Sequence, residues 1–185
     1  MDLKKAREAA ITSPASHVPA FVHVQTAAQS LPFDELRWEN FEKLCYRLAG
    51  KDADVESHSL YGRAGQAQQG IDIFARKRNG RYNAWQAKCY KKYSGNDLEK
   101  ACTTFLLGDW SHKTEVFFIA VQCSVDDTHL QNAIEKQAAL FRERDIILRV
   151  FGGQDLCTAL RSHPDIVLEF FGRECAKQFF GDTVS

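Results

Sequence analysis

The sequence predicts a single α/β domain in which helices flank a central mixed sheet. Short apolar runs of strand length alternate with stretches of helical periodicity, and a chain of 185 residues with 44% hydrophobic residues can bury one core. The formal net charge is zero, and no apolar run approaches the length of a membrane span. We therefore expect a soluble, cytoplasmic protein that does not contact a membrane.

The elements are predicted in the order α-β-β-β-α-β, followed by further helices and a strand. Asp34 precedes a stretch with apolar residues at helical spacing, which ends at Gly50. The strands are predicted at residues 55–60, 71–77, 82–90, 115–122 and 146–151. The later helices are predicted at residues 98–107, 127–144, 154–161 and 165–179, the last with Pro164 at its start.

Three segments are expected in the domain organisation. Residues 1–30 lack periodicity and are interpreted as an N-terminal arm or appended helix, and residues 31–162 as the main folded domain. Residues 163–185 are interpreted as a C-terminal helix that could join a downstream domain. This segment contains four phenylalanines, Phe170, Phe171, Phe179 and Phe180. If they are exposed, they predict self-association or docking of a downstream domain; alternatively, some of them complete the core.

The six cysteines form no Cys-x-x-Cys pair, and most lie within apolar periodic segments. They are predicted to be reduced core thiols. The six histidines show no zinc-ligand spacing, and the chain has neither a Walker sequence nor a Gly-x-Ser-x-Gly elbow. Zinc chemistry, NTP hydrolysis and serine hydrolysis are therefore not expected.

The most informative motif is Gly70-Ile71-Asp72, followed on the next apolar run by Gln86-Ala87-Lys88. Residues two apart on a strand share a face, so Gln86 and Lys88 point the same way. A carboxylate and an amide oxygen suit a hard cation such as Mg²⁺, and Lys88 could orient water or neutralise charge developing on phosphorus. We expect Asp72 and Lys88 to serve the substrate rather than packing.

The side on which Asp72 lies depends on the turn at Asn79-Gly80. A two-residue turn would set Asp72 opposite Ala87 and away from Gln86 and Lys88. A three-residue loop over residues 78–80, with Gly80 in the left-handed region, sets Asp72 opposite Gln86. The sequence therefore predicts an odd-length loop, or a bulge that restores the same parity.

This motif resembles the PD-(D/E)xK nuclease superfamily, and specifically its Mrr-like branch, in which Gln replaces the usual acidic residue. Phe41-Glu42 on the first helix and the polar, glycine-rich stretch at 61–70 belong to the same resemblance, which spans about residues 33–123. It implies a restriction-endonuclease-like core and a Mg²⁺-dependent DNA endonuclease, with Mn²⁺ as a substitute metal. The stretch is similar to one in nuclease effector domains of bacterial anti-phage defence proteins.

The resemblance also implies the roles of the site residues. Asp72, Gln86 and the backbone carbonyl of Ala87 would bind the metal, and Lys88 would be catalytic. Glu42 would join them from the first helix, or would be an ordinary glutamate on the helix surface. Double-stranded DNA is the expected partner.

Nine basic residues against three acidic ones give residues 63–100 a local net charge of +6, which suits phosphate contact. The residues expected to bind nucleic acid are Arg63, Gln66, Gln69, Lys91 and Lys92. Three alternatives stay open: an inactive nucleic-acid-binding or assembly module of the same fold, an RNase, and a junction-resolving nuclease.

Overall fold

The computed structural model describes residues 11–13, 30–62 and 69–181. Five strands form one sheet in the order β1-β2-β3-β4-β5. The strands are β1 Val55–Leu60, β2 Ile73–Lys77, β3 Tyr82–Lys88, β4 Thr114–Val121 and β5 Ile147–Phe151. The first three run antiparallel and the last three parallel, so the prediction of an α/β fold with a mixed sheet is confirmed.

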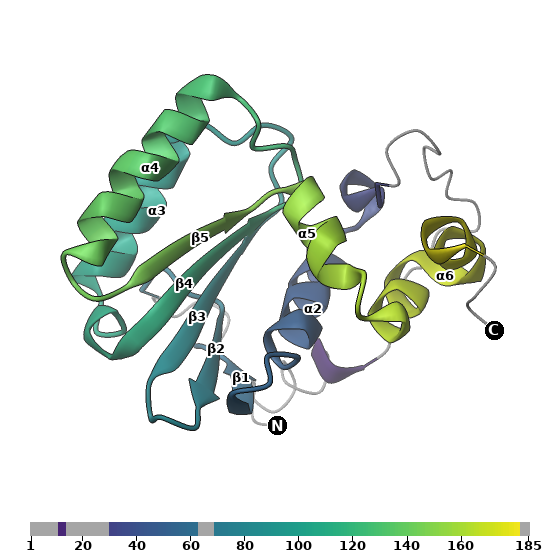
Figure 1. Ribbon diagram of the computed structural model, residues 1–185, viewed down its shortest axis with the longest axis horizontal. Helices are drawn as coiled ribbons and strands as arrows, with labels where there is room; N and C mark the ends of the chain where they lie inside the picture. The colour runs from purple at the N-terminus through teal and green to yellow at the C-terminus, as the bar shows by residue number, and fades with distance from the viewer. Residues whose placement is uncertain (1–10, 14–29, 63–68, 182–185) are drawn as a thin grey trace.

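Helices cover both faces of this sheet (Figure 1). The α-helices are α2 Trp38–Ala49, α3 Gly95–Leu107, α4 Thr128–Arg142, α5 Gly153–Leu160 and α6 Pro164–Phe180, and two short 3₁₀ turns lie at Phe33–Glu35 and Ser111–Lys113. One buried cluster packs α2, α5 and α6 on one face, and a second packs α3 and α4 on the other. None of the helices in the described ranges is long and apolar enough to cross a membrane.

Helix α2 begins at Trp38 rather than directly after Asp34. Phe33 and Leu36 are both buried, and their carbonyl oxygens each accept a 2.9 Å hydrogen bond from the side-chain amide of Gln122. This anchor holds Leu36 and Arg37 in extended conformations, so the helix starts only at Trp38. The anchor links the start of α2 to the end of β4.

Helix α3 starts at a capping box. The Ser94 hydroxyl accepts from the Asp97 backbone N–H at 3.2 Å, and the Asp97 carboxylate accepts from the Ser94 backbone N–H at 3.0 Å. These bonds fix the first turn of α3 beside the end of β3. The hydrogen bonds from Ser94 also lower the pKa of the Asp97 carboxyl group.

Of the two interpretations of the C-terminal phenylalanines, completion of the core is confirmed and an exposed apolar surface is wrong. Phe170, Phe171 and Phe179 are at most 1% exposed, and Phe180 packs against the same cluster. Helix α6 kinks at Gly172, whose φ of 82° is left-handed, and this bend lets both halves of the helix face the core. The C-terminal segment thus belongs to the domain core, and these side chains give no reason to expect self-association.

All six cysteines are free, four of them buried and two half-buried, as the sequence predicts. The N-terminal arm lies mostly outside the described residues. Of residues 11–13, Ile11 is buried in the α2 cluster, and the backbone carbonyl of Thr12 accepts from Arg47 at 2.6 Å.

Candidate functional site

The β2–β3 turn has the parity that the sequence analysis requires. Lys77 lies opposite Arg81, with its N–H donating to the Arg81 carbonyl at 2.8 Å, and Gly80 has a φ of 82°. The paired residues Ile73 and Trp85, and Arg76 and Tyr82, continue the same register. The predicted three-residue loop is confirmed, and this register brings Asp72 to the level of Gln86.

Asp72 lies where β2 leaves the regular ladder. Its backbone N–H donates to the carbonyl of Trp85 at 2.8 Å, and its carboxylate accepts the Ala87 N–H at 2.9 Å. The Asp72 carboxylate therefore accepts the Ala87 N–H in place of a backbone carbonyl, at the end of the β2–β3 pair. The expectation that Asp72 serves only the substrate is wrong, because the carboxylate also holds β2 against β3.

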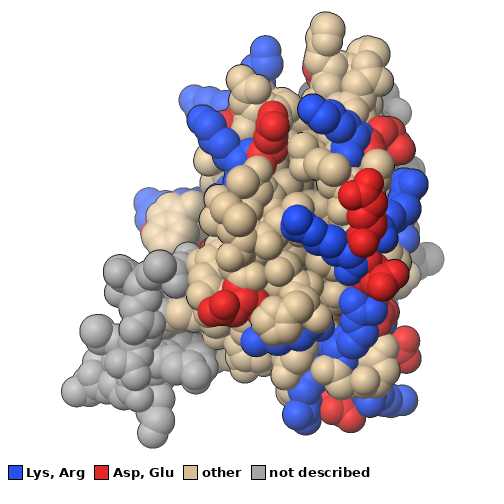
Figure 2. Space-filling view, turned by 90° about the vertical axis from the view of Figure 1, so that its left-hand side faces the viewer, with Lys and Arg blue, Asp and Glu red and all other residues tan. Residues whose placement is uncertain are grey.

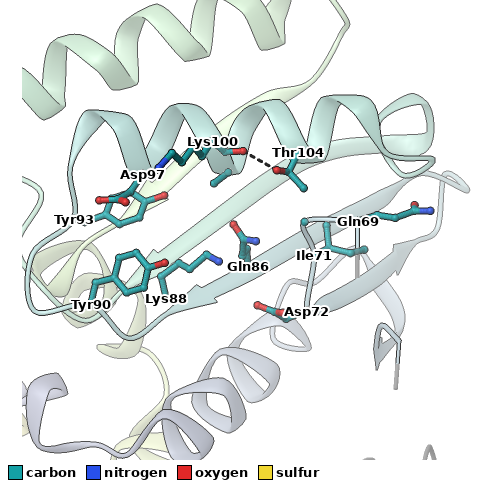
Figure 3. Close-up of a pocket in the computed structure, with 12 residues that line it drawn as sticks. Gln69, Ile71, Asp72, Gln86, Lys88, Tyr90, Tyr93, Asp97, Lys100 and Thr104 are labelled. Atoms are coloured by element: carbon teal, nitrogen blue, oxygen red, sulfur yellow. Dashed lines mark hydrogen bonds between the residues drawn. The ribbon is translucent and has the colours of Figure 1, made fainter. Parts of the chain in front are cut away.

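Gln86 and Lys88 line one hollow of about 550 Å³ between the end of β3 and α3, and Asp72 lines it too. In Figure 3 the ammonium end of Lys88 points toward Gln86, and the Asp72 carboxylate lies on the side away from α3. Tyr90, Tyr93, Asp97 and Lys100 complete the wall from the β3–α3 connection and α3. The predicted trio is thus brought together in one hollow.

The amide oxygen of Gln86 is the most informative atom of this hollow. Gln86 is only 7% exposed, and its Oε1 is buried without a hydrogen-bond partner. Buried acceptors are nearly always paired in folded proteins, because leaving one unpaired costs free energy. An unpaired oxygen in a hollow that a carboxylate and an ammonium also line fits a site that binds something absent from the chain itself.

Glu42 lies in a neighbouring hollow of about 330 Å³ between α2 and β3, which Asp72, Ala87 and Lys88 also line. It is 8% exposed, so the interpretation as an ordinary surface glutamate is wrong. Glu42 does not line the larger hollow that contains Gln86. Asp72 and Lys88 stand between the two hollows and connect them.

The Ala87 carbonyl faces the same edge of β3 as Asp72. Lys88 pairs with β4, since its carbonyl accepts from the Gln122 N–H at 3.3 Å. Successive residues of a strand direct their backbone groups to opposite edges, so the Ala87 N–H and C=O both point toward β2. The Ala87 N–H bond to Asp72 agrees with this direction.

Oxygen atoms of the kind that a hard cation prefers line both hollows. Gln86 lines the larger hollow, Glu42 and Ala87 line the smaller one, and Asp72 lines both; carboxylate, amide and carbonyl oxygens are ligands that Mg²⁺ prefers. Among the described residues, no group of three or more His, Cys, Asp and Glu side chains could hold a metal. A site here would therefore depend on the amide and the backbone oxygen as well as on the carboxylates.

Two thiols lie near these carboxylates, and the sequence analysis did not connect them with the site. Burial raises the pKa of Cys89 to about 11, and the carboxylates of Glu42, Glu39 and Asp72 raise it further. Burial likewise raises the pKa of Cys45 well above its usual value. Both thiols stay protonated at neutral pH, which disfavours them as metal ligands or nucleophiles.

The basic residues of 63–100 do not form one patch, which corrects the expectation of a +6 cluster around the site. The basic residues of the β2–β3 hairpin lie at the start of β3, whereas the candidate site lies at its end. The seven residues of this strand separate the two groups by about 20 Å. Arg76 pairs with Glu56 at 3.3 Å, and Lys77 pairs with Glu115. Figure 2, which views the left-hand side of Figure 1, shows acidic and basic side chains intermingled across that face.

Lys91 and Lys92 are exposed directly after the site strand, so they remain candidates for phosphate contact. Gln69 lines the larger hollow, but its amide donates to Asp109 at 2.9 Å and accepts from the Asp109 N–H at 3.1 Å. Its side chain thus anchors the loop to the end of α3. Arg63 and Gln66 lie outside the described residues.

Among the residues that line the two hollows, Trp38, Tyr90, Tyr93 and Asp97 were not foreseen from the sequence as site residues. Tyr90 follows Lys88 by two residues, a spacing that could have indicated it. The other three are brought in by the packing of α2 and α3, which has no local signal. Comparison of the sequence with protein-family models finds no matching family, and comparison with curated proteins finds no significant similarity.

Proposed function

We propose that this protein is a Mg²⁺-dependent DNA endonuclease. The observation that carries the proposal is the buried, unpaired Oε1 of Gln86 in the hollow that Asp72 and Lys88 also line. An oxygen left without a partner inside a folded protein is explained if a cation supplies the missing interaction. Mn²⁺ would substitute for Mg²⁺ at such a site.

The fold supports the assignment to the PD-(D/E)xK superfamily and its Mrr-like branch. Three antiparallel strands are followed by two parallel ones, with α2 before the sheet and α3 between β3 and β4, which is the order expected of a restriction-endonuclease-like core. Its motif residues lie at the ends of β2 and β3. A role as effector of a bacterial anti-phage defence system rests on the sequence resemblance alone.

Asp72, Gln86 and the Ala87 carbonyl would hold the metal, with Glu42 reaching it from α2. Bound there, Mg²⁺ would act as a Lewis acid on the scissile phosphate and lower the pKa of a water. The N–H of Ala87 fixes the orientation of the Asp72 carboxylate, so that ligand is already positioned.

Lys88 would act on the reacting atoms. As a water oxygen bonds to phosphorus and the P–O bond to the leaving oxygen breaks, negative charge grows on the phosphoryl oxygens. The Lys88 ammonium, on the wall between the two hollows, is placed to donate a hydrogen bond to that charge or to orient the water. We propose the cytoplasm as its location, because free thiols suit a reducing compartment.

A plasmid assay tests the proposal. Purified protein is incubated with supercoiled DNA in Mg²⁺, in Mn²⁺ and in EDTA, beside the Lys88→Ala variant. The proposal expects nicked or linear product with either metal, none with EDTA, and none with the variant. Binding of DNA without cleavage under any of these conditions would instead favour a non-catalytic module of the same fold.

A further inference from the structure

Two exposed aromatic rings flank the candidate site. The described residues contain six exposed large hydrophobic side chains, and the two aromatic ones among them are Trp38, 61% exposed, and Tyr90, 40% exposed. Both line the smaller hollow, together with Glu42, Asp72 and Lys88. The four aliphatic ones, Leu107, Leu140, Ile147 and Leu168, line neither hollow of the site.

Trp38 and Glu42 are one helical turn apart on α2. Residues at i and i+4 lie on the same side of a helix, and Trp38 and Glu42 accordingly both line the smaller hollow. Trp38 is the first residue of α2, and its neighbour Phe41 supplies the buried contact of this turn. The exposed indole is thus not explained by packing of the core.

Tyr90 lies where three hollows meet. It lines the hollow with Gln86, the hollow with Trp38, and a third of about 680 Å³ that Lys91 also lines. Its ring is 5.7 Å from that of Tyr93 and tilted by 42°. The hydroxyl of Tyr93 is buried without a partner, so a second unpaired polar atom faces the same region as Gln86.

We infer that Trp38 and Tyr90 bind unpaired bases, and that the preferred substrate is single-stranded DNA or a locally unpaired stretch of a duplex. In a regular duplex each base is already stacked between its neighbours and hydrogen-bonded to its partner. Exposed rings beside a phosphate-cleaving centre can stack only on bases that are free of both. Lys91 and Lys92, next to Tyr90 in the chain, lie where the backbone of such a strand would run.

This inference deepens the proposed function and narrows its substrate from duplex DNA to unpaired DNA. The smaller hollow, at about 330 Å³, falls in the range of pockets that take small organic groups. The two rings that would stack on bases come from different segments, Trp38 from α2 and Tyr90 from the segment after β3. The scissile phosphate would lie between them, against Asp72 and Lys88.

Tryptophan fluorescence tests this inference without any cleavage. The chain has three tryptophans, and Trp85 and Trp110 are 4% and 6% exposed, so quenching by added DNA reports Trp38. The protein is titrated in EDTA with a 20-nucleotide oligothymidylate and, separately, with a blunt duplex of the same length at the same salt concentration. We expect strong quenching and tighter binding with the single strand.

Variants separate stacking from general attraction. The variants are measured by the fluorescence anisotropy of end-labelled DNA, because replacing Trp38 removes the tryptophan signal. Trp38→Ala and Tyr90→Ala should each weaken single-strand binding by about 5- to 150-fold, the range of one lost base stack, and should leave duplex binding nearly unchanged. Trp38→Phe, which keeps a ring, should lose much less, and Leu107→Ala, at an exposed aliphatic position, should lose nothing. Equal losses on both DNAs, or no loss on the single strand, would overturn the inference.

The outcome is independent of catalysis. A protein that cuts plasmid but shows no Trp38-dependent binding of the single strand would keep its proposed function and lose this substrate assignment. A protein that binds the single strand through Trp38 and Tyr90 but cuts no DNA with Mg²⁺ would keep the assignment of single-strand binding and lose the proposed endonuclease function.

Discussion

Replacing Gln86 by methionine should make the protein more stable and inactive at the same time. Methionine keeps the length of the side chain but removes the buried Oε1 that has no hydrogen-bond partner. A buried unpaired acceptor costs about 1–3 kcal/mol. After allowing for the lost amide nitrogen, we expect Gln86→Met to raise the free energy of unfolding by about 1 kcal/mol, or about 2–4 °C in Tm for a chain of this length.

Mg²⁺ should reverse the order of stability. A ligand that binds only the folded state at 100 times its Kd stabilises that state by about 2.7 kcal/mol. The wild type should gain this increment, whereas the methionine variant, which lacks one ligand oxygen, should gain much less. Gln86→Glu is the matched control, because it keeps an oxygen but adds a buried charge, so it should be least stable without metal and should respond most to Mg²⁺.

Urea unfolding followed by circular dichroism, with and without Mg²⁺, measures both effects. The reasoning would be refuted if Gln86→Met were destabilised by more than about 1 kcal/mol without metal, because Oε1 would then have a structural partner. A wild-type midpoint that does not respond to Mg²⁺ would refute the metal assignment.

Three further predictions concern the framework of the site. Asp72→Ala should lose activity and also about 1–3 kcal/mol of stability, because the Ala87 N–H loses its acceptor, whereas Asp72→Asn should lose activity with a smaller loss in urea unfolding. Gly70→Ala should be more destabilising than Gly80→Ala. Both glycines have φ near +80°, but only at Gly70 would the new Cβ meet the backbone of α3, 3.1 Å from the Phe105 nitrogen. Equal urea midpoints for the two variants would contradict this. The double variant Lys91→Glu with Lys92→Glu should weaken DNA binding for all sequences and lower the slope of the log binding constant against log salt by about 2. The control double variant Arg76→Glu with Arg78→Glu, at the far end of the sheet, should change neither. A larger loss of binding in the control than in the lysine variant would place the phosphate path at the hairpin.

Much of the fold could be predicted because its signals are local. Alternating and helical periodicities indicated each strand and helix to within a few residues, and the capping pair Ser94 and Asp97 lies just ahead of the helix predicted at residues 98–107. The parity of the β2–β3 turn was also predictable, since a strand has only two faces and Gly80 permits a left-handed residue. Together these rules placed Asp72, Gln86 and Lys88 in one hollow.

The remaining features depend on packing between distant segments. The sequence does not show that Glu42 and Gln86 lie in separate hollows joined by Asp72, because this depends on how α2 and α3 pack on opposite faces of the sheet. The local charge count also failed, since residues close in sequence at the hairpin and at the site are separated by the length of β3. The burial of both Phe171 and Phe179, on the two halves of α6, likewise depends on the bend at Gly172.

We propose that Lys88 acts on the transition state of phosphodiester hydrolysis beside a bound Mg²⁺. The most direct measurement is the single-turnover rate of DNA cleavage with protein and Mg²⁺ both saturating, for the wild type, Lys88→Ala and the neighbouring Lys91→Ala. Loss of one positioned donor typically lowers such a rate by about 10²–10³-fold, so we predict at least this decrease for Lys88→Ala and little change for Lys91→Ala. Equal rates for the wild type and a well-folded Lys88→Ala variant would contradict the account.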